Sequence, residues 1–309
     1  MPRSLAMEIL SAIASSARNH HADGSDAERD FEVGEFERLE VAGPFDVNVQ
    51  TGGSVGVHAS GPEWSLDNLR IELEGDRLFI GCEGDCDGDV NVSVSVPRLR
   101  ALRTSGSGDV SIDRLAGDDF EGASSGSGDL SIDSLDVQKL NLSTSGSGDV
   151  RIDKVRADTF EATTMGSGDL SFDAIESTTL KLTINGSGDA RIEEFCGETV
   201  EARVTGSGDV AIESVEAASV SLQVFGSGDI YLAEGSVKAL ALETSGSGDI
   251  STEGVEAKEA RLSVCGSGDI SAQVTGKAEI AVMGSGDVSV TGAAKCTVVG
   301  GGSGEIRCS

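Results

Sequence analysis

The tetrapeptide Gly-Ser-Gly-Asp recurs along this chain at a fixed interval, and this regularity restricts the fold more than any other feature. It begins at Gly106, Gly126 and Gly146 and continues at the same spacing of 20 as far as Gly266. One more copy begins at Gly284 and Gly-Ser-Gly-Glu begins at Gly302, each after a spacing of 18. Repeats of this length are typical of solenoids, in which each repeat is one structural unit that stacks on its neighbours.

Apolar and polar residues alternate on both sides of each tetrapeptide. Leu140 and Leu142 alternate before one copy, and Val150 and Ile152 alternate after it. A period of two indicates a strand with one buried face, so we predict two short strands per repeat, with the tetrapeptide as the turn between them. A second, less regular turn closes the repeat. The predicted inward residues include Val110, Ile112, Leu130, Ile132, Val150, Ile152, Leu142, Leu182 and Leu222.

The length of one repeat matches one turn of a flattened solenoid. Twenty extended residues span roughly 66 Å. Two strands of about 17–20 Å and two crossings of about 10 Å use nearly all of that length. Because 20 is even, the inward positions stay in register from one rung to the next. We therefore predict an all-β, parallel β-solenoid with about 20 residues per rung, narrowing slightly where the spacing falls to 18.

The repeated turns are the candidate site, and we predict that their role is structural. Glycine permits positive φ and a close approach of stacked backbones, and serine and aspartate can accept or donate hydrogen bonds within their own turn. The turn residues singled out on this ground are Gly106, Gly108, Asp109, Gly126, Gly128, Asp129, Gly146, Gly148, Asp149, Gly166, Gly168, Asp169, Gly186, Gly188, Asp189, Gly206, Gly208 and Asp209.

The pattern divides the chain into three parts. Residues 1–29 are interpreted as a leader, disordered or a short helix: Arg3 and the following apolar stretch resemble a signal peptide, whereas Glu8 interrupts that stretch, so no clean signal peptide is present. Residues 30–100 alternate less regularly and are predicted to form first rungs or a β cap. Residues 101–309 form the repeat solenoid.

Charge limits the partners. The chain carries 53 acidic and 23 basic residues, a formal net charge of −30, which disfavours nucleic acid and anionic membrane surfaces. No apolar run in the sequence reaches the length that a membrane-spanning helix needs, so we expect no such span.

The six cysteines leave several pairings open. Cys82 and Cys86 could form a local disulfide, stay free, or contribute to a metal site. Cys296 and Cys308 both take the inward register of the last rung. A bridge between them requires the rung to pinch, because facing sheets lie about 10 Å apart and a disulfide needs Cα atoms within about 7 Å. The alternatives are a homodimer formed through residues 294–309, which we favour at this point, or a frayed end.

The stretch "FERLEVAGPFDVNVQTGG", then "LRIELEGDRLFIG" and then the serial "GSGD" turns resemble the head GIN domain family of putative autotransporter adhesins. The resemblance covers residues 30–309. It implies a right-handed, two-sheet parallel β-helix with GSG as the tight turn between the sheets, and an extracytoplasmic location in the periplasm, on the outer membrane surface or outside the cell. It supplies no catalytic residues; only the turn positions carry over.

Enzymatic function has little support in the residues. The histidines are His20, His21 and His58, all outside the repeats, and no Ser–His–Asp triad is evident. The nearly constant repeat length leaves no long insertion to build the groove of a sugar lyase. Phe225 and Tyr231 flank one turn and could form a small contact patch, although isolated exposed aromatics are the simpler interpretation.

The column of turn aspartates offers the main alternative. Stacked about 4.8 Å apart, they either accept turn N–H hydrogen bonds and face solvent, or hold a row of divalent cations. We predict the former, with no metal and no cofactor. The preferred function is a non-catalytic structural or adhesive module with an unidentified glycan or protein ligand. A cation-dependent binding scaffold comes second and a carbohydrate-active β-helix enzyme third.

Overall fold

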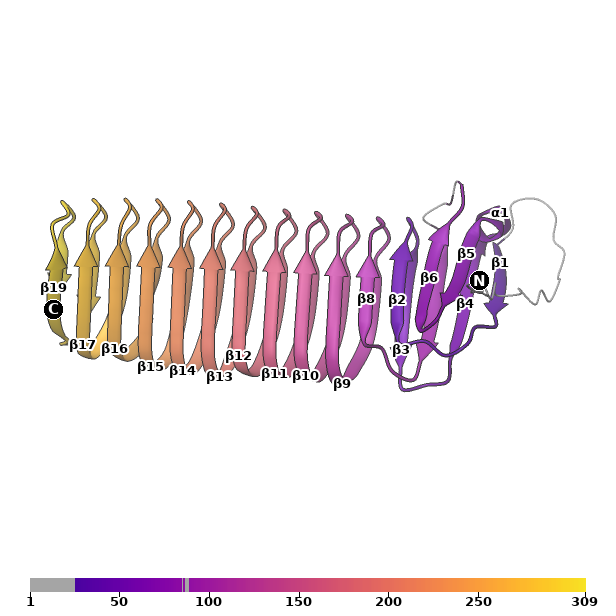
Figure 1. Ribbon diagram of the computed structural model, residues 1–309, viewed down its shortest axis with the longest axis horizontal. Helices are drawn as coiled ribbons and strands as arrows, with labels where there is room; N and C mark the ends of the chain where they lie inside the picture. The colour runs from indigo at the N-terminus through magenta and orange to yellow at the C-terminus, as the bar shows by residue number, and fades with distance from the viewer. Residues whose placement is uncertain (1–25, 85, 87–88) are drawn as a thin grey trace, which may run out of the picture.

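The computed structural model describes residues 26–84, 86 and 89–309. They form one hydrogen-bonded sheet of 20 strands that winds into a long stack of rungs, with a short helix α1 (Glu63–Asp67) near the N-terminal end (Figure 1). The chain is a parallel β-solenoid in which equivalent residues of most neighbouring rungs are separated by 20 positions, as predicted. The predicted leader comprises residues 1–29. Of these, residues 1–25 lie outside the described part of the chain, whereas residues 26–29 belong to strand β1 (Asp26–Phe31) and not to a leader.

The repeat region consists of one short strand followed by long strands, and all of them pair in chain order. Each is in parallel register with the next at an offset of one repeat, as in Val150 with Leu170. These strands are β8 (Ala101–Thr104), β9 (Val110–Ser124), β10 (Leu130–Thr144), β11 (Val150–Thr164), β12 (Leu170–Ile184), β13 (Ala190–Val204), β14 (Val210–Val224), β15 (Ile230–Thr244), β16 (Ile250–Val264) and β17 (Ile270–Val282).

The second corner of each rung differs from the expected turn. Each strand from β9 to β16 is 15 residues long and passes through the corner without ending. In β10 the paired residues skip Asp133 and Gln138, so the chain bends at these two points and residues 134–137 form a short middle segment. Leu135 and Val137 point inward there, and two consecutive outward residues at each bend interrupt the alternation on either side of this segment.

The core runs the length of the stack as columns of inward apolar side chains. All nine residues predicted to point inward are buried, from Ile152 and Leu222 at 0% exposure to Leu142 at 5%. Larger side chains interlock between rungs: the rings of Phe160 and Phe172 meet edge to face, with centroids 5.2 Å apart. Since every rung buries its inner face against the next, the repeats stabilise one another rather than fold singly.

The shorter C-terminal rungs lose their two residues at the second corner. The pairing of β16 with β17 shifts between Thr252 and Glu256 and again between Ala257 and Glu259. The turn side therefore keeps its register. The stack ends in three short strands, β18 (Val288–Thr291), β19 (Lys295–Gly300) and β20 (Ile306–Cys308). β18 and β19 both pair with β17, and β20 pairs with β18.

The N-terminal part is a rung with a cap inserted into it. Strands β2 (Arg38–Ala42) and β3 (Asp46–Thr51) form the rung below the first repeat, and they pair in parallel with β8 and β9. Between β3 and the first repeat, the chain forms four further strands: β4 (Gly56–Pro62), β5 (Leu69–Glu74), β6 (Arg77–Cys82) and β7 (Asn91–Val96).

These inserted strands lie on the outer side of the first rung. β6 and β7 pair in parallel with β2 and β3, whereas β5 pairs antiparallel with β6, and β1 and β7 pair antiparallel with β4. The spatial order thus departs from the chain order, and the stack ends in antiparallel hairpin-like pairs (Figure 1).

Candidate functional site: the turn ridge

The Gly-Ser-Gly-Asp turns line up along one edge of the stack and form what we call the turn ridge, residues 106–109 and their equivalents up to 302–305 (Figure 1). The ridge begins one rung earlier than the repeat, because the turn Gly43–Asp46 lies directly under Gly106–Asp109. In the turn of the second repeat the serine and aspartate side chains are exposed, while the glycines are half-buried or buried.

Glycine is required in the ridge because stacked turns approach too closely for a side chain. A Cβ on Gly126 would lie 1.8 Å from the Gly106 carbonyl oxygen, and one on Gly188 would lie 2.1 Å from that of Gly168. The expectation of positive φ is wrong for these turns: glycines with positive φ lie elsewhere, as at Gly75 between β5 and β6. Close approach alone explains the repeated glycines.

The turn aspartates form a continuous ladder, defined as Asp46, Asp109 and each equivalent up to Asp287 and Glu305. The carboxylate Oδ1 of each aspartate accepts a hydrogen bond from the backbone N–H of the next residue in the ladder, at 2.7–2.9 Å. The prediction that these carboxylates bond within their own turn is wrong, because each side chain connects its own rung to the following one.

This ladder offsets the repulsion between stacked carboxylates. Two like charges about 4.8 Å apart repel each other by roughly 0.9 kcal/mol in water. A hydrogen bond to a charged acceptor stabilises the fold by about 1.5–3 kcal/mol, which is more than this repulsion. At the last rung Glu305 replaces aspartate, and its carboxylate accepts from Arg307 at 2.8 and 3.0 Å. In the described residues no group of three or more His, Cys, Asp or Glu side chains is arranged to hold a metal ion.

Beside the ladder runs a groove that follows the long axis of the stack. Its wall is the ladder from Asp109 to Asp209, and its floor is the next outward position of each strand, from Ser131 to Ala211. Two floor residues are arginines held by acidic side chains: Arg151 donates to Asp173 at 2.7 Å, and Arg191 pairs with Glu213 at 2.9 Å. These ion pairs join neighbouring rungs.

Aromatic side chains flank the ridge at one rung, as predicted from the sequence. Phe225 comes just before the turn and carries the guanidinium of Arg203 over its ring, 4.4 Å from the centroid. Tyr231 comes just after the turn on the groove side and is 48% exposed. The two rings therefore lie on opposite sides of the turn ridge.

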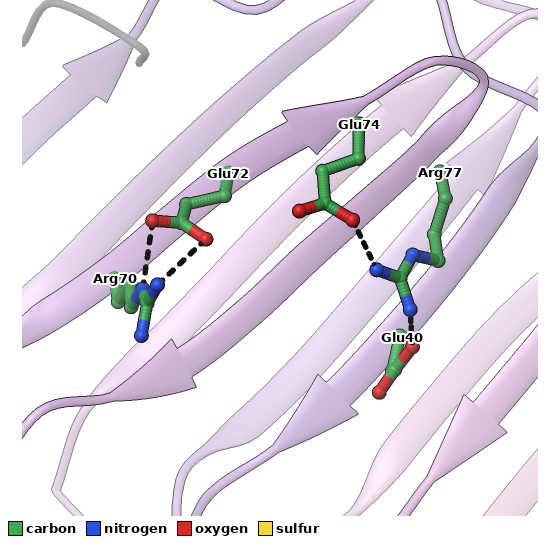
Figure 2. A network of polar contacts seen from close by, with 5 residues as sticks. All are labelled: Glu40, Arg70, Glu72, Glu74 and Arg77. Carbon is green, nitrogen blue, oxygen red and sulfur yellow. Dashed lines mark hydrogen bonds and ion pairs between the residues drawn. The ribbon is translucent and has the colours of Figure 1, made fainter. Parts of the chain in front are cut away.

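The N-terminal hairpin carries a separate network of charges (Figure 2). Arg77 links Glu74 on β5 with Glu40 on β2, and Arg70 pairs with Glu72. Hydrogen bonding to Glu74 and the charge of Glu40 raise the pKa of Arg77, so its guanidinium stays charged at every physiological pH. Backbone pairing of β6 with β2 holds the hairpin on the first rung, and these exposed ion pairs add little energy to it.

His58 on β4 lies directly opposite Asp30 on β1 and Ser93 on β7. The three residues are far apart in the sequence, which gives no indication that they are close. His58 Nδ1 lies 2.8 Å from Asp30 Oδ1. The row resembles a Ser–His–Asp order, but it lies on an open sheet face. The backbone of β7 around Ser93 is engaged with β3 and β4, so these amides are not free to stabilise an oxyanion.

The cysteines pair at both ends of the stack. Cys82 and Cys86 form a disulfide, which decides between the three alternatives left open for them. Cys296 and Cys308 also form a disulfide with Cα atoms 6.6 Å apart, so the last rung does pinch. Cys196 and Cys265 are free and exposed. The homodimer through residues 294–309 stays a prediction; Val298, in the inward register of this rung, is 51% exposed there.

Comparison with known proteins identifies relatives of the same architecture. The family described as "Putative auto-transporter adhesin, head GIN domain" matches residues 35–214 and 193–294. A search of curated proteins found no match.

Two crystal structures share the fold. A putative adhesin from Bacteroides fragilis has 24% identity and a TM-score of 0.59, covering 67% of this chain and 97% of its own. A putative adhesin from Parabacteroides merdae has 17% identity and a TM-score of 0.50, covering 92% of this chain and 97% of its own. Because the family match extends over most of the described solenoid, this chain belongs to the head GIN domain family of putative autotransporter adhesins.

Proposed function

We propose that this protein is a non-catalytic adhesive module that acts outside the cytoplasm. The observation that carries this proposal is the turn ridge, which presents the same exposed serine and aspartate side chains from rung to rung along the stack. A surface of this kind offers many equivalent weak contacts rather than one enclosed pocket, which suits attachment to an extended partner. Membership of an adhesin family points in the same direction.

The cysteine pairing favours a location outside the cytoplasm. The disulfides Cys82–Cys86 and Cys296–Cys308 are of a type that persists in oxidising compartments and is rare in the cytosol. Among the described residues, no helix is long and apolar enough to cross a membrane.

The adhesive role is tested by attachment of the purified full chain to defined surfaces. Beads carrying the chain are applied to a glycan array and to a panel of immobilised extracellular matrix proteins, with albumin-coated beads as the control. We expect saturable retention on at least one surface and competition by free chain. Retention no greater than that of albumin beads would contradict the proposal, and release of new reducing ends from any glycan would favour the enzyme alternative.

A further inference from the structure

We propose that the groove beside the aspartate ladder binds the extended chain of a neutral, hydroxyl-rich glycan, with Tyr231 as the surface on which one sugar ring stacks. This inference rests on the proposed adhesive function and names the chemical class of its ligand.

The groove has the size and direction of a site for a linear ligand. It extends over successive rungs from Asp109 to Asp209, at about 4.8 Å per rung. Its volume is about 830 Å³, within the range of about 300–1,000 Å³ found for ligand sites in proteins. A polymer lying along it would meet a carboxylate at each rung and could repeat the same contact several times.

The groove contains both acceptors and donors, but its cations are already paired. One oxygen of each ladder carboxylate accepts a backbone N–H, which leaves the other oxygen to accept a hydroxyl from a ligand. Arg151 and Arg191 are held by Asp173 and Glu213. Phosphate or sulfate groups would face a negative wall without a free guanidinium, so anionic glycans are disfavoured.

An extended peptide fits this surface less well than a sugar chain. Peptides commonly bind sheets by adding a strand to a free edge, where backbone groups are unpaired. The groove crosses the strands instead, over β10 to β14, whose backbones pair with one another. Contacts here come from side chains alone, which suits a ligand that offers hydroxyl groups.

Tyr231 occupies the next position along the groove floor, and it is aromatic, unlike the floor residues from Ser131 to Ala211. It is the direct neighbour of Ala211, the last floor residue, and Ser251 follows it on the next rung. These small neighbours leave the ring open on both sides, and it is 48% exposed. At the outward position two residues further, Glu213 and Glu253 flank Ala233, so the acidic column is interrupted beside the ring. An open aromatic face next to carboxylate acceptors can pack on the apolar C–H face of a sugar.

The test measures binding of neutral oligosaccharides, cellohexaose and maltohexaose, to the full chain and to two variants matched for loss of an aromatic ring. Tyr231→Ser removes the stacking ring, and Trp64→Ser removes an aromatic side chain of equal exposure, 48%, from helix α1 far from the groove. Thermal melts establish that both variants fold. We expect Tyr231→Ser to weaken binding about tenfold, the loss of an aromatic contact of about 1.4 kcal/mol, and Trp64→Ser to leave it unchanged.

Three outcomes would overturn the proposal. The first is an intact chain that binds neither oligosaccharide at millimolar concentration. The second is an equal effect of the two substitutions. The third is binding only to a polylysine peptide, lost in moderate salt, which would assign the groove to cationic ligands. If beads carrying Tyr231→Ser adhere as well as the unmodified chain while glycan binding is absent, this inference fails and the adhesive function stands.

Discussion

At each turn glycine, the carbonyl oxygen of the rung below occupies the space that a Cβ would need. We therefore expect Gly188→Val to destabilise the chain by at least about 3 kcal/mol, since a side chain 2.1 Å from the Gly168 oxygen forces the backbone of two rungs apart. Denaturant unfolding monitored by circular dichroism measures this. Ser187→Ala is the control in the same turn: it leaves the backbone bond to Gly166 intact and should change little. Equal stability of the two variants would contradict the packing argument.

The aspartate ladder makes a second prediction at single residues. Asp169→Ala leaves the N–H of Asp189 without its acceptor and should cost about 1–2 kcal/mol. Asp169→Asn keeps an oxygen acceptor and removes one repelling charge, so its stability should lie between that of the unmodified chain and Asp169→Ala. Comparison of the free energies of unfolding checks the order. If alanine were as stable as asparagine, the side-chain bond would contribute nothing and the ladder would be incidental.

At the scale of strands, much of the repeat region follows from the sequence and its ends do not. The alternation of residues such as Leu130 and Ile132 predicts inward columns because the spacing is constant. The bends at Asp133 and Gln138 leave only a short sequence signal: the spacing between inward residues rises from two to three at each bend, and Leu135 and Val137 resume the alternation between the bends. The Gly43–Asp46 turn does not match the repeat in sequence, because its middle residues are proline and phenylalanine and the strands of the inserted cap separate it from the repeat.

The last rung lacks a following strand in the described residues, and its disulfide is expected to hold it in place. Cys296→Ser should increase hydrogen exchange in β19 and β20, because it releases a closed loop whose restriction is worth up to about 3 kcal/mol. The central rungs should keep their protection. Cys196→Ser, which removes a free thiol on β13, should alter neither region. Unchanged exchange in β19 and β20 would mean that stacking alone secures the end of the stack.

At the scale of the whole molecule, local rules account for the architecture and long-range arrangement accounts for the candidate site. One rung predicts the next, so a constant repeat length yields the stack without any knowledge of distant contacts. The groove depends on which outward side chains follow one another across rungs, from Ser131 to Tyr231. The sequence places Tyr231, with Phe225, beside one turn as an exposed aromatic residue, but the groove that leads to Tyr231 becomes visible only once the strands are in register.

The stack as a whole is expected to need no calcium, even though its net charge is −30. Each ladder carboxylate already has a backbone N–H as partner, so a cation is not required to hold the rungs together. Millimolar calcium should therefore raise the melting temperature no more than sodium chloride of matched ionic strength, which screens the same repulsion. The pair of melts separates specific binding from screening, and a magnesium sample controls for charge. A rise of many degrees with calcium alone, reversed by a chelator, would instead show ions bound along the ladder and would favour the cation-dependent scaffold.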